Sequence, residues 1–178
     1  MGNKYIIVAT DYLTKWVECR ATPTCKSWEV SKFLIEQVFC CHGCPAKILS
    51  DRGTPFLSNI AKDVYEMMST KHVKTTSYHP QTNGLTERWN REICNMISMY
   101  VSKDQTDWDV ALPMLALAYV SSVHSTTGFT PFYLLYGREA WLPIHHVLKI
   151  PGLGVENAYQ YHSNMLEALP KSSQDCKN

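Results

Sequence analysis

The stretch Ala46–Gly53, with the sequence AKILSDRG, decides the fold class. Its first five residues form a short apolar run that is typical of a buried strand, and Asp51 follows where that strand should end. Gly53 then allows the chain to turn away sharply. In an α/β sheet, ligand chemistry gathers beyond the carboxyl ends of the strands. Asp51 is therefore the first candidate site residue.

A second carboxylate, Glu87, is separated from Asp51 by the 35 residues of positions 52–86. It falls in the first turn of a helix expected from about residue 83 to 101, where the positive end of the helix dipole favours an anion. Carboxylate oxygens suit Mg²⁺ or Mn²⁺, which usually take one or two protein carboxylates. The sequence thus predicts Asp51 and Glu87 as metal ligands. The plainer alternative is a turn residue and a surface helix residue.

Hydrophobic periodicity predicts an α/β fold in which a mixed sheet is flanked by helices. The first two strands are expected to form an antiparallel hairpin. Expected strands span 4–10, 15–19, 46–50 and 73–77, and expected helices span 25–41, 58–68, 83–101, 107–121, 131–136 and 156–169.

Three helix starts have predicted N-caps, which are Thr24, Ser58 and Thr130, and Gly137 is expected to end the helix that Thr130 opens. The inward side of the helix after Ser58 is predicted to carry apolar residues at helical spacing. These residues are Ile60, Ala61, Val64, Tyr65 and Met68.

The bulk composition sets wide limits on function. The 178 residues fit one domain with a real core, and the net charge of +1 neither demands nor excludes a nucleic-acid partner. No apolar run is long enough to span a bilayer. The 7 cysteines, an odd count, favour reduced thiols in an intracellular protein. Cys41–Cys44 has the spacing of half a zinc site, but structural cysteines are the favoured interpretation.

Basic and amide side chains surround the two acids in the sequence. The arginines and lysines nearby, a set that suits a phosphate backbone, are Lys47, Arg52, Lys71, Lys74, Arg88 and Arg91. Tyr78, Gln81 and Asn83 add an aromatic face and amides on a turn-rich loop. These residues suit a nucleic-acid partner.

Several long motifs, in order, resemble the integrase catalytic core of retroviruses and Ty3/Gypsy LTR retrotransposons. They are YIIVATDYLTKW at 5–16, SDRG at 50–53, YHPQTNG at 78–84, ERWN at 87–90 and TPFYLLYGR at 130–138. The resemblance covers about residues 3–148. It implies an RNase H-like fold and an Asp, Asp, Glu triad that holds two Mg²⁺ (or Mn²⁺) ions.

The same resemblance implies a function. The intact element would join its ends to target DNA by 3′-end processing and strand transfer, in the nucleus, as a homodimer or higher oligomer and with no membrane partner. Asp51 and Glu87 would be the second and third acids. Arg88, Arg91, Gln81 and Asn83 would contact DNA.

The first acid of that triad is the open question. Asp11 is the obvious candidate, but it matches the end of the family's second strand, and a turn residue that bonds its own backbone is the favoured interpretation. The family's first acid lies on an earlier strand, so we expect this chain to be N-terminally truncated, to lack its first strand and to be inactive alone. The alternative is a non-catalytic DNA-binding or dimerisation module derived from an integrase. Residues 1–148 form the expected core domain, followed by a helix and tail at 149–178.

Overall fold

The computed structural model describes residues 2–75, 84–100, 107–147 and 160–167. These residues belong to two compact units. The first unit comprises Met1–Ala9 and Glu18–Leu115, and the second comprises Thr10–Val17 and Ala116–Asn178. The domain boundary expected at residue 148 stays a prediction.

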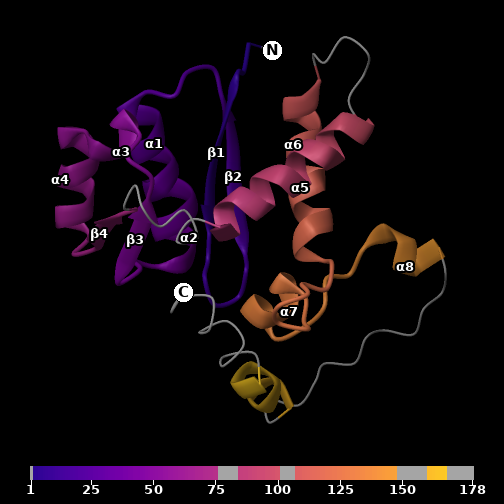
Figure 1. Cartoon of the computed structure of the whole chain (residues 1–178). Coiled ribbons are helices and arrows are strands. Elements are labelled where there is room, and N and C mark those ends of the chain that lie inside the picture. Colours follow the sequence, from indigo (N-terminus) through magenta and orange to yellow (C-terminus); the bar gives the residue numbers. More distant parts are fainter. Residues whose placement is uncertain (1, 76–83, 101–106, 148–159, 168–178) are drawn as a thin grey trace. The chain divides into compact units, whose positions relative to one another are not determined.

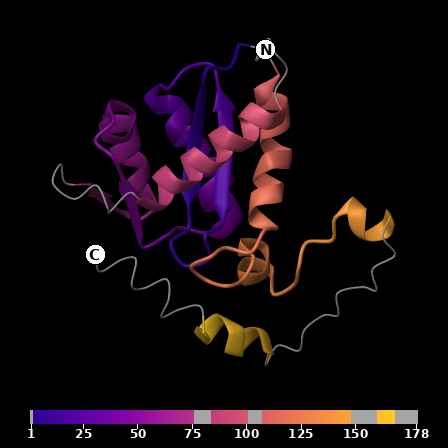
Figure 2. The ribbon, with the colours of Figure 1, turned by 45° about the vertical axis from the view of Figure 1, so that its right-hand side comes forward.

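The chain opens with a β-hairpin, as the sequence predicts. Strand β1 covers Tyr5–Thr10 and strand β2 covers Val17–Thr22, and the two lie side by side in both ribbon views (Figure 1; Figure 2). The backbone N–H of Lys4 donates to the carbonyl of Thr22 at 2.9 Å. The residue before β1 therefore lies opposite the last residue of β2, which makes the pair antiparallel.

The second strand begins two residues later than predicted. The N–H of Asp11 donates to the carbonyl of Trp16 at 2.9 Å, so the turn extends to Trp16. Within it, Lys15 adopts the left-handed conformation with φ 63° and is fully buried. A residue with positive φ cannot continue a strand, which explains why the alternation at 15–19 was misread.

The helical segment after the hairpin has three parts rather than one. α1 spans Ser27–Phe33, a π-helix spans Leu34–Phe39, and α2 spans Cys40–His42. The π turn is marked by the N–H of Cys40, which donates to the carbonyl of Ile35. Because the wider turn changes which side faces inward, Phe39 is buried and Val38 only partly buried.

The predicted N-cap of this helix is wrong. Lys26 occupies the N-cap position, and its N–H donates to the carboxylate of Glu29 at 3.1 Å. The Thr24 hydroxyl also donates to that carboxylate. Glu29 at the third helical position thus accepts the N–H of the N-cap residue. The Thr24 hydroxyl donates to Glu29 and does not cap a backbone N–H.

Strands β3 (Lys47–Ser50) and β4 (Lys71–Lys74) form a parallel pair in which Ile48 lies opposite His72. β4 thus begins two residues before the predicted 73–77. Within the described part of the chain, β1 pairs only with β2 and β3 only with β4, so the strands form two small sheets.

A short helix, α3 (Thr54–Leu57), precedes α4 (Asn59–Met67). Ser58 caps α4 as predicted, because its Oγ accepts the N–H of Ala61 at 3.2 Å. The prediction for Ile60 is wrong, since 51% of this residue is exposed. The inward side of so short a helix is narrow, and its position next to the cap points away from the core.

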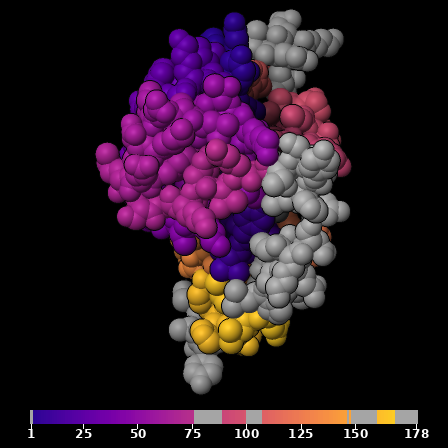
Figure 3. Space-filling model, turned by 60° about the vertical axis from the view of Figure 1, so that its left-hand side comes forward, coloured from indigo at the N-terminus to yellow at the C-terminus, as the bar shows by residue number. Residues whose placement is uncertain are grey.

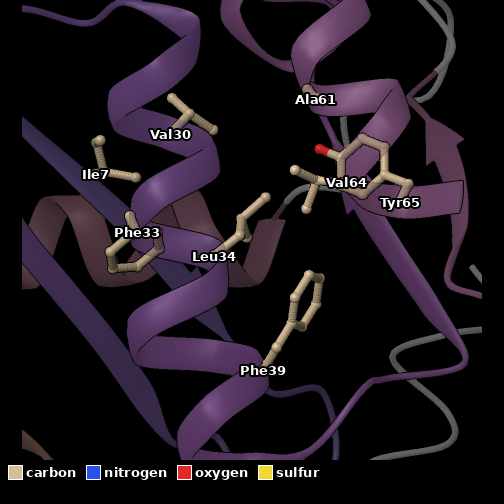
Figure 4. Close-up of a cluster of buried hydrophobic side chains, with 8 residues drawn as sticks. All are labelled: Ile7, Val30, Phe33, Leu34, Phe39, Ala61, Val64 and Tyr65. Atoms are coloured by element: carbon tan, nitrogen blue, oxygen red, sulfur yellow. The ribbon is translucent and has the colours of Figure 1, made fainter. Parts of the chain in front are cut away.

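One apolar core joins these elements in the first unit. In Figure 4, Leu34 and Phe39 of the π-helix lie on the side facing α4, and Phe33 of α1 lies on the side of Ile7 of β1. The cluster consists of Ile7, Val30, Phe33, Leu34, Phe39, Ala61, Val64 and Tyr65. Ile48 of β3 packs against it, so both small sheets share the core.

The remaining helices are α5 (Gly84–Tyr100), α6 (Trp108–Val120), α7 (Pro131–Tyr136), α8 (Pro143–Val147) and a helix over residues 160–167. The first three confirm predicted helices within one or two residues at each end. α6 contains Pro113. None of the described helices combines the length and apolar character that crossing a membrane requires.

In the second unit, α7 has the predicted ends. The hydroxyl of Thr130 accepts the N–H of Tyr133 at 3.0 Å, and Gly137 closes the helix in the left-handed conformation with φ 70°. The helix over 160–167 packs on this end, because the ring of Tyr161 lies 3.5 Å from the place of a Cβ on Gly137. The Tyr161 hydroxyl also donates to the carbonyl of Leu134 at 2.9 Å.

Candidate functional site

Asp51 follows β3 directly and is exposed. Its Oδ1 accepts the backbone N–H of Gly53 at 2.8 Å, which fixes the carboxylate over the turn. A Cβ at residue 53 would lie 2.9 Å from the same oxygen, closer than real Cβ contacts allow. The sequence predicts a turn at Gly53. The structure shows in addition that the absence of a side chain at this position leaves room for the Asp51 carboxylate.

Behind Asp51 lies a buried polar contact that the sequence did not reveal. The hydroxyl of Ser50 lies 2.8 Å from the Asp51 carbonyl and 2.8 Å from Nε2 of His72. The His72 ring packs on Tyr65, with centroids 4.5 Å apart and 30° between the planes. Burial, and then the charge of Lys74, lower the pKa of His72. The contact depends on the register of β3 and β4, which the sequence alone does not give.

Arg52 ties the turn to the end of β4. Its Nε donates to the carbonyl of Thr75 at 3.2 Å, and the N–H of Thr75 donates to the carbonyl of Ser50 at 2.9 Å. Thr75 therefore bonds both neighbours of Asp51, the backbone carbonyl of Ser50 and the side chain of Arg52. The guanidinium thus has a structural contact in addition to any role in binding phosphate.

The face of α5 expected to be polar is exposed at every described position, which are Arg91, Cys94, Asn95 and Ser98. Trp89 and Ile93, on the expected apolar side, are buried. Position 87 lies one helical turn before Arg91. The side chains of Glu87 and Arg88, and the residues Gln81 and Asn83, lie outside the described residues, so their predicted roles stay predictions.

Lysines line the β3–β4 pair. Lys47 and Lys71 lie opposite each other in the register, and both are exposed, as is Lys74 at the end of β4. Figure 3 shows the surface of the first unit in this part of the chain, coloured magenta. Lys74 lies at the same end of the strand pair as the Asp51 turn, whereas Lys47 and Lys71 lie at the opposite end. The three exposed ammonium groups give the strand pair a basic character that suits an anionic polymer.

Asp11 has the geometry of a turn residue. Its Oδ2 accepts both the N–H and the hydroxyl of Thr14, each at 2.7 Å, and its carbonyl accepts the N–H of Lys15 at 3.0 Å. This is the turn that the sequence predicts for Asp11. Asp11 belongs to the second unit and Asp51 to the first.

Cysteines make local contacts rather than a cluster. Cys41 Sγ lies 3.3 Å from the carbonyl of Glu36, and Cys44 Sγ lies 3.7 Å from Sδ of Met68. Among the residues that the structure describes, no group of three or more His, Cys, Asp or Glu side chains could hold a metal ion. The pKa of the exposed Cys25 thiol is raised by partial burial, then by the charges of Glu29 and Asp51.

Solved structures show what this arrangement resembles. The HTLV-2 integrase catalytic core domain in complex with magnesium, in a trimeric form, matches with a TM-score of 0.60 and 22% identity, over 71% of this chain and 81% of that one. The catalytic core domain of BIV integrase matches with a TM-score of 0.61 and 19% identity, over 81% and 89%. This chain has the fold of a retroviral integrase catalytic core. The prediction of an RNase H-like α/β fold is thereby confirmed.

A larger assembly shows the same fold. The simian T-cell lymphotropic virus intasome in complex with the PP2A regulatory subunit B56 gamma matches with a TM-score of 0.65 and 19% identity, over 85% of this chain and 51% of that one. In sequence, no family model matches this chain.

Its sequence relatives are Pol polyproteins. The Pol polyprotein of transposon 412 from Drosophila melanogaster is 28% identical over 81% of this chain, and that of radiation murine leukemia virus (strain Kaplan) is 29% identical over 96%. The Gag-Pol polyprotein of feline leukemia virus is 28% identical over 97%. The chain spans only 12%, 29% and 10% of the length of these relatives.

Proposed function

We propose that this integrase core comes from a Ty3/Gypsy LTR retrotransposon and serves DNA integration, by 3′-end processing and strand transfer, in the intact element. The observation that carries the proposal is the Asp51 carboxylate. It stands exposed at the end of β3, held on one oxygen by the Gly53 N–H, and the exposed Lys74 ends the neighbouring strand β4. A fixed acid with an exposed cation at the same end of the strand pair suits a metal-dependent reaction on a phosphodiester.

Asp51 and Glu87 would be the protein ligands of a divalent ion, and the complete site would hold two. The donor set fits, because a carboxylate that already accepts one N–H keeps oxygen lone pairs for a hard cation. When bound, Mg²⁺ or Mn²⁺ supplies Lewis-acid stabilisation of the phosphoryl group. A magnesium complex of the HTLV-2 integrase core supports divalent metal use in this fold.

The chain itself binds and orients DNA. Arg88, Arg91, Gln81 and Asn83 would contact the DNA near the site, and Arg91 is exposed on α5 as such a contact requires. The reacting oxygen would be that of a water in end processing or of a DNA 3′-hydroxyl in strand transfer. No side chain acts as a nucleophile in this scheme.

The chain alone is proposed to be inactive in strand transfer. Oδ2 of Asp11 already accepts two hydrogen bonds from Thr14 within its turn, which supports a structural role for this acid. The test is an assay with labelled terminal DNA and Mg²⁺ or Mn²⁺. We expect no joined product. Robust joining that Asp11→Asn abolishes would contradict this assignment of Asp11.

Binding of DNA can be tested without turnover. Arg91→Gln is expected to weaken binding of a labelled duplex and to lower its salt dependence by about one phosphate contact. Arg138→Gln is the matched control, because Arg138 lies over the ring of Phe132 in the second unit. Equal binding by the wild type and Arg91→Gln would remove Arg91 from the interface.

The protein is proposed to be nuclear, because integration acts on chromosomal DNA. The location of a fluorescent fusion of the protein tests this proposal.

A second candidate function, a dimerisation module without catalysis, is favoured by α6. This helix is apolar on most sides, yet Val110 and Met114, one turn apart, are 64% and 65% exposed. Apolar residues at this spacing on a solvent face mark a protein interface. The trimeric form and the intasome among the structural neighbours support an oligomer.

Sedimentation of the purified chain distinguishes these functions. Met114→Lys is expected to shift a self-associating chain toward monomer, and Met67→Lys on α4, where Met67 is 76% exposed, is the matched control. Self-association or DNA binding without any metal affinity would favour the module. Metal binding at Asp51 would favour the enzyme core.

A further inference from the structure

The hydroxyl of Ser50 makes two hydrogen bonds, which together fix the position of every proton in the contact. Ser50 Oγ lies 2.8 Å from the carbonyl oxygen of Asp51 and 2.8 Å from Nε2 of His72. A carbonyl can only accept, so the single hydroxyl proton is directed to Asp51. Nε2 of His72 must then carry a proton and donate it to Ser50 Oγ.

The imidazole of His72 is held in place from two sides. His72 is paired with Ile48 in the parallel register, two residue pairs before the end of β3. Its ring packs against Tyr65 of the core at a centroid distance of 4.5 Å. Ser50 itself is buried, with 7% exposed. The contact therefore runs from the core through β4 to the backbone of Asp51.

We propose that His72 is a positioning residue for Asp51, donating from Nε2 to Ser50 Oγ so that the Ser50 hydroxyl holds the Asp51 carbonyl. The proposal rests on the proposed function, since it assigns Asp51 as the ligand that needs to be held. Together with the N–H of Gly53 on the carboxylate, the contact fixes both the main chain and the side chain of Asp51. Partners of metal ligands that fix their orientation contribute to metal affinity in this way.

Three variants distinguish the hydrogen bond that His72 donates from the packing of its ring. His72→Phe keeps an aromatic ring against Tyr65 but removes the donor. His72→Gln places an amide N–H near the position of Nε2 and should restore the bond. Ser50→Ala removes the link to Asp51. His42→Phe is the matched control, because it replaces a histidine of α2 whose Nε2 lies 2.8 Å from Oε1 of Glu18 in β2.

Two measurements are made on the whole chain. In the metal-free protein, the ¹³C shift of the Asp51 carbonyl reports the bond from Ser50, and we expect it to change in His72→Phe and Ser50→Ala but not in His72→Gln or His42→Phe. With Mn²⁺ added, broadening of the Asp51 and Gly53 amide signals measures affinity. His72→Phe should weaken affinity about threefold to tenfold, and the double variant with Ser50→Ala should add nothing further.

The outcomes decide the proposal in both parts. An unchanged Asp51 carbonyl shift in His72→Phe, or a changed one that His72→Gln fails to restore, would overturn the positioning role. Loss of Mn²⁺ affinity only in proportion to lost thermal stability would overturn it too. If the wild type broadens at no Mn²⁺ concentration, the proposed metal function fails, while the metal-free shift still decides whether His72 holds Asp51.

Discussion

Asp11 and Asp51 stand in the same local setting but are used differently. Each follows a strand, each is exposed, and each carboxylate accepts a backbone N–H from two or three residues ahead. One oxygen of Asp11 accepts a second bond from the Thr14 hydroxyl, and its turn encloses the buried Lys15. Asp51 accepts one bond from Gly53, and its backbone is held by Ser50.

The difference shows that the neighbours of an acid determine its role more than its place at a strand end. The hydrogen bonds of the Asp11 carboxylate stabilise the turn between β1 and β2. The bonds around Asp51 orient a carboxylate that remains available to a ligand. Removing Asp11 should therefore change the stability of the fold, and removing Asp51 should change binding.

The largest expected effect is on metal binding. Asp51→Asn should weaken Mn²⁺ affinity by more than about tenfold, because a neutral amide replaces an anionic oxygen ligand. The thermal midpoint should hardly move, since Asp51 is exposed. Isothermal titration of each variant with Mn²⁺ measures the effect. Asp11→Asn is the paired control, and an equal loss in both variants would remove the distinction between the two acids.

The next effect is on stability. Asp11→Ala leaves the N–H and hydroxyl of Thr14 without their acceptor and should lower the free energy of unfolding by about 1–2 kcal/mol. Urea denaturation measures the change. Asp63→Ala on the exposed side of α4 should have little effect. If Asp11→Ala is no less stable than Asp63→Ala, the turn does not depend on this carboxylate.

A smaller effect is expected at the glycine beside Asp51. In Gly53→Ala the new Cβ would meet Oδ1 of Asp51 at 2.9 Å, so the carboxylate must move while the backbone, whose φ is −56°, need not. Mn²⁺ affinity should fall about threefold, the equivalent of one weakened hydrogen bond, with little loss of stability. Gly2→Ala is the control, because a Cβ there meets nothing within 4 Å. Unchanged affinity would show that the orientation of Asp51 is unimportant.

The smallest effect is electrostatic. The charge of Asp51 contributes, after burial and Glu29, to raising the pKa of the Cys25 thiol. Asp51→Asn removes that charge and should lower the pKa, so the thiolate forms at a lower pH. The rate of alkylation by iodoacetamide is measured at a series of pH values by peptide mass spectrometry. Cys40, a second exposed thiol in the same sample, is the internal reference for Cys25. A profile for Cys25 that does not move would place Asp51 too far away to act.

Local sequence patterns predicted most elements of the fold. The strand before Asp51, the caps Ser58 and Thr130, and the glycine end at Gly137 all follow from interactions within a few residues, and all are present. Asp51 and the exposed face of α5 were predicted for the same reason. The motifs predicted the fold of an integrase catalytic core because they are long and occur in order.

What the sequence did not predict depends on contacts or backbone angles that periodicity does not encode. Lys15 alternates like a strand residue, but its φ of 63° ends the pattern. Thr24 has the right residue type for a cap, yet Glu29 takes its hydroxyl. The contact of His72 with Ser50 exists only because two strands, 22 residues apart, pair in one register.

The π-helix at Leu34–Phe39 has a consequence for how the length of the chain can change. A π turn accommodates one extra residue while the helix on either side keeps its phase. Gln37 lies in this turn, and its Oε1 is buried without a hydrogen-bond partner among the described residues. Deletion of Gln37 should close the turn into a regular α-helix and remove that buried oxygen. The segment is thus a position where a one-residue deletion should be tolerated, whereas the same deletion in α1 would rotate one part of the helix by about 100° relative to the other.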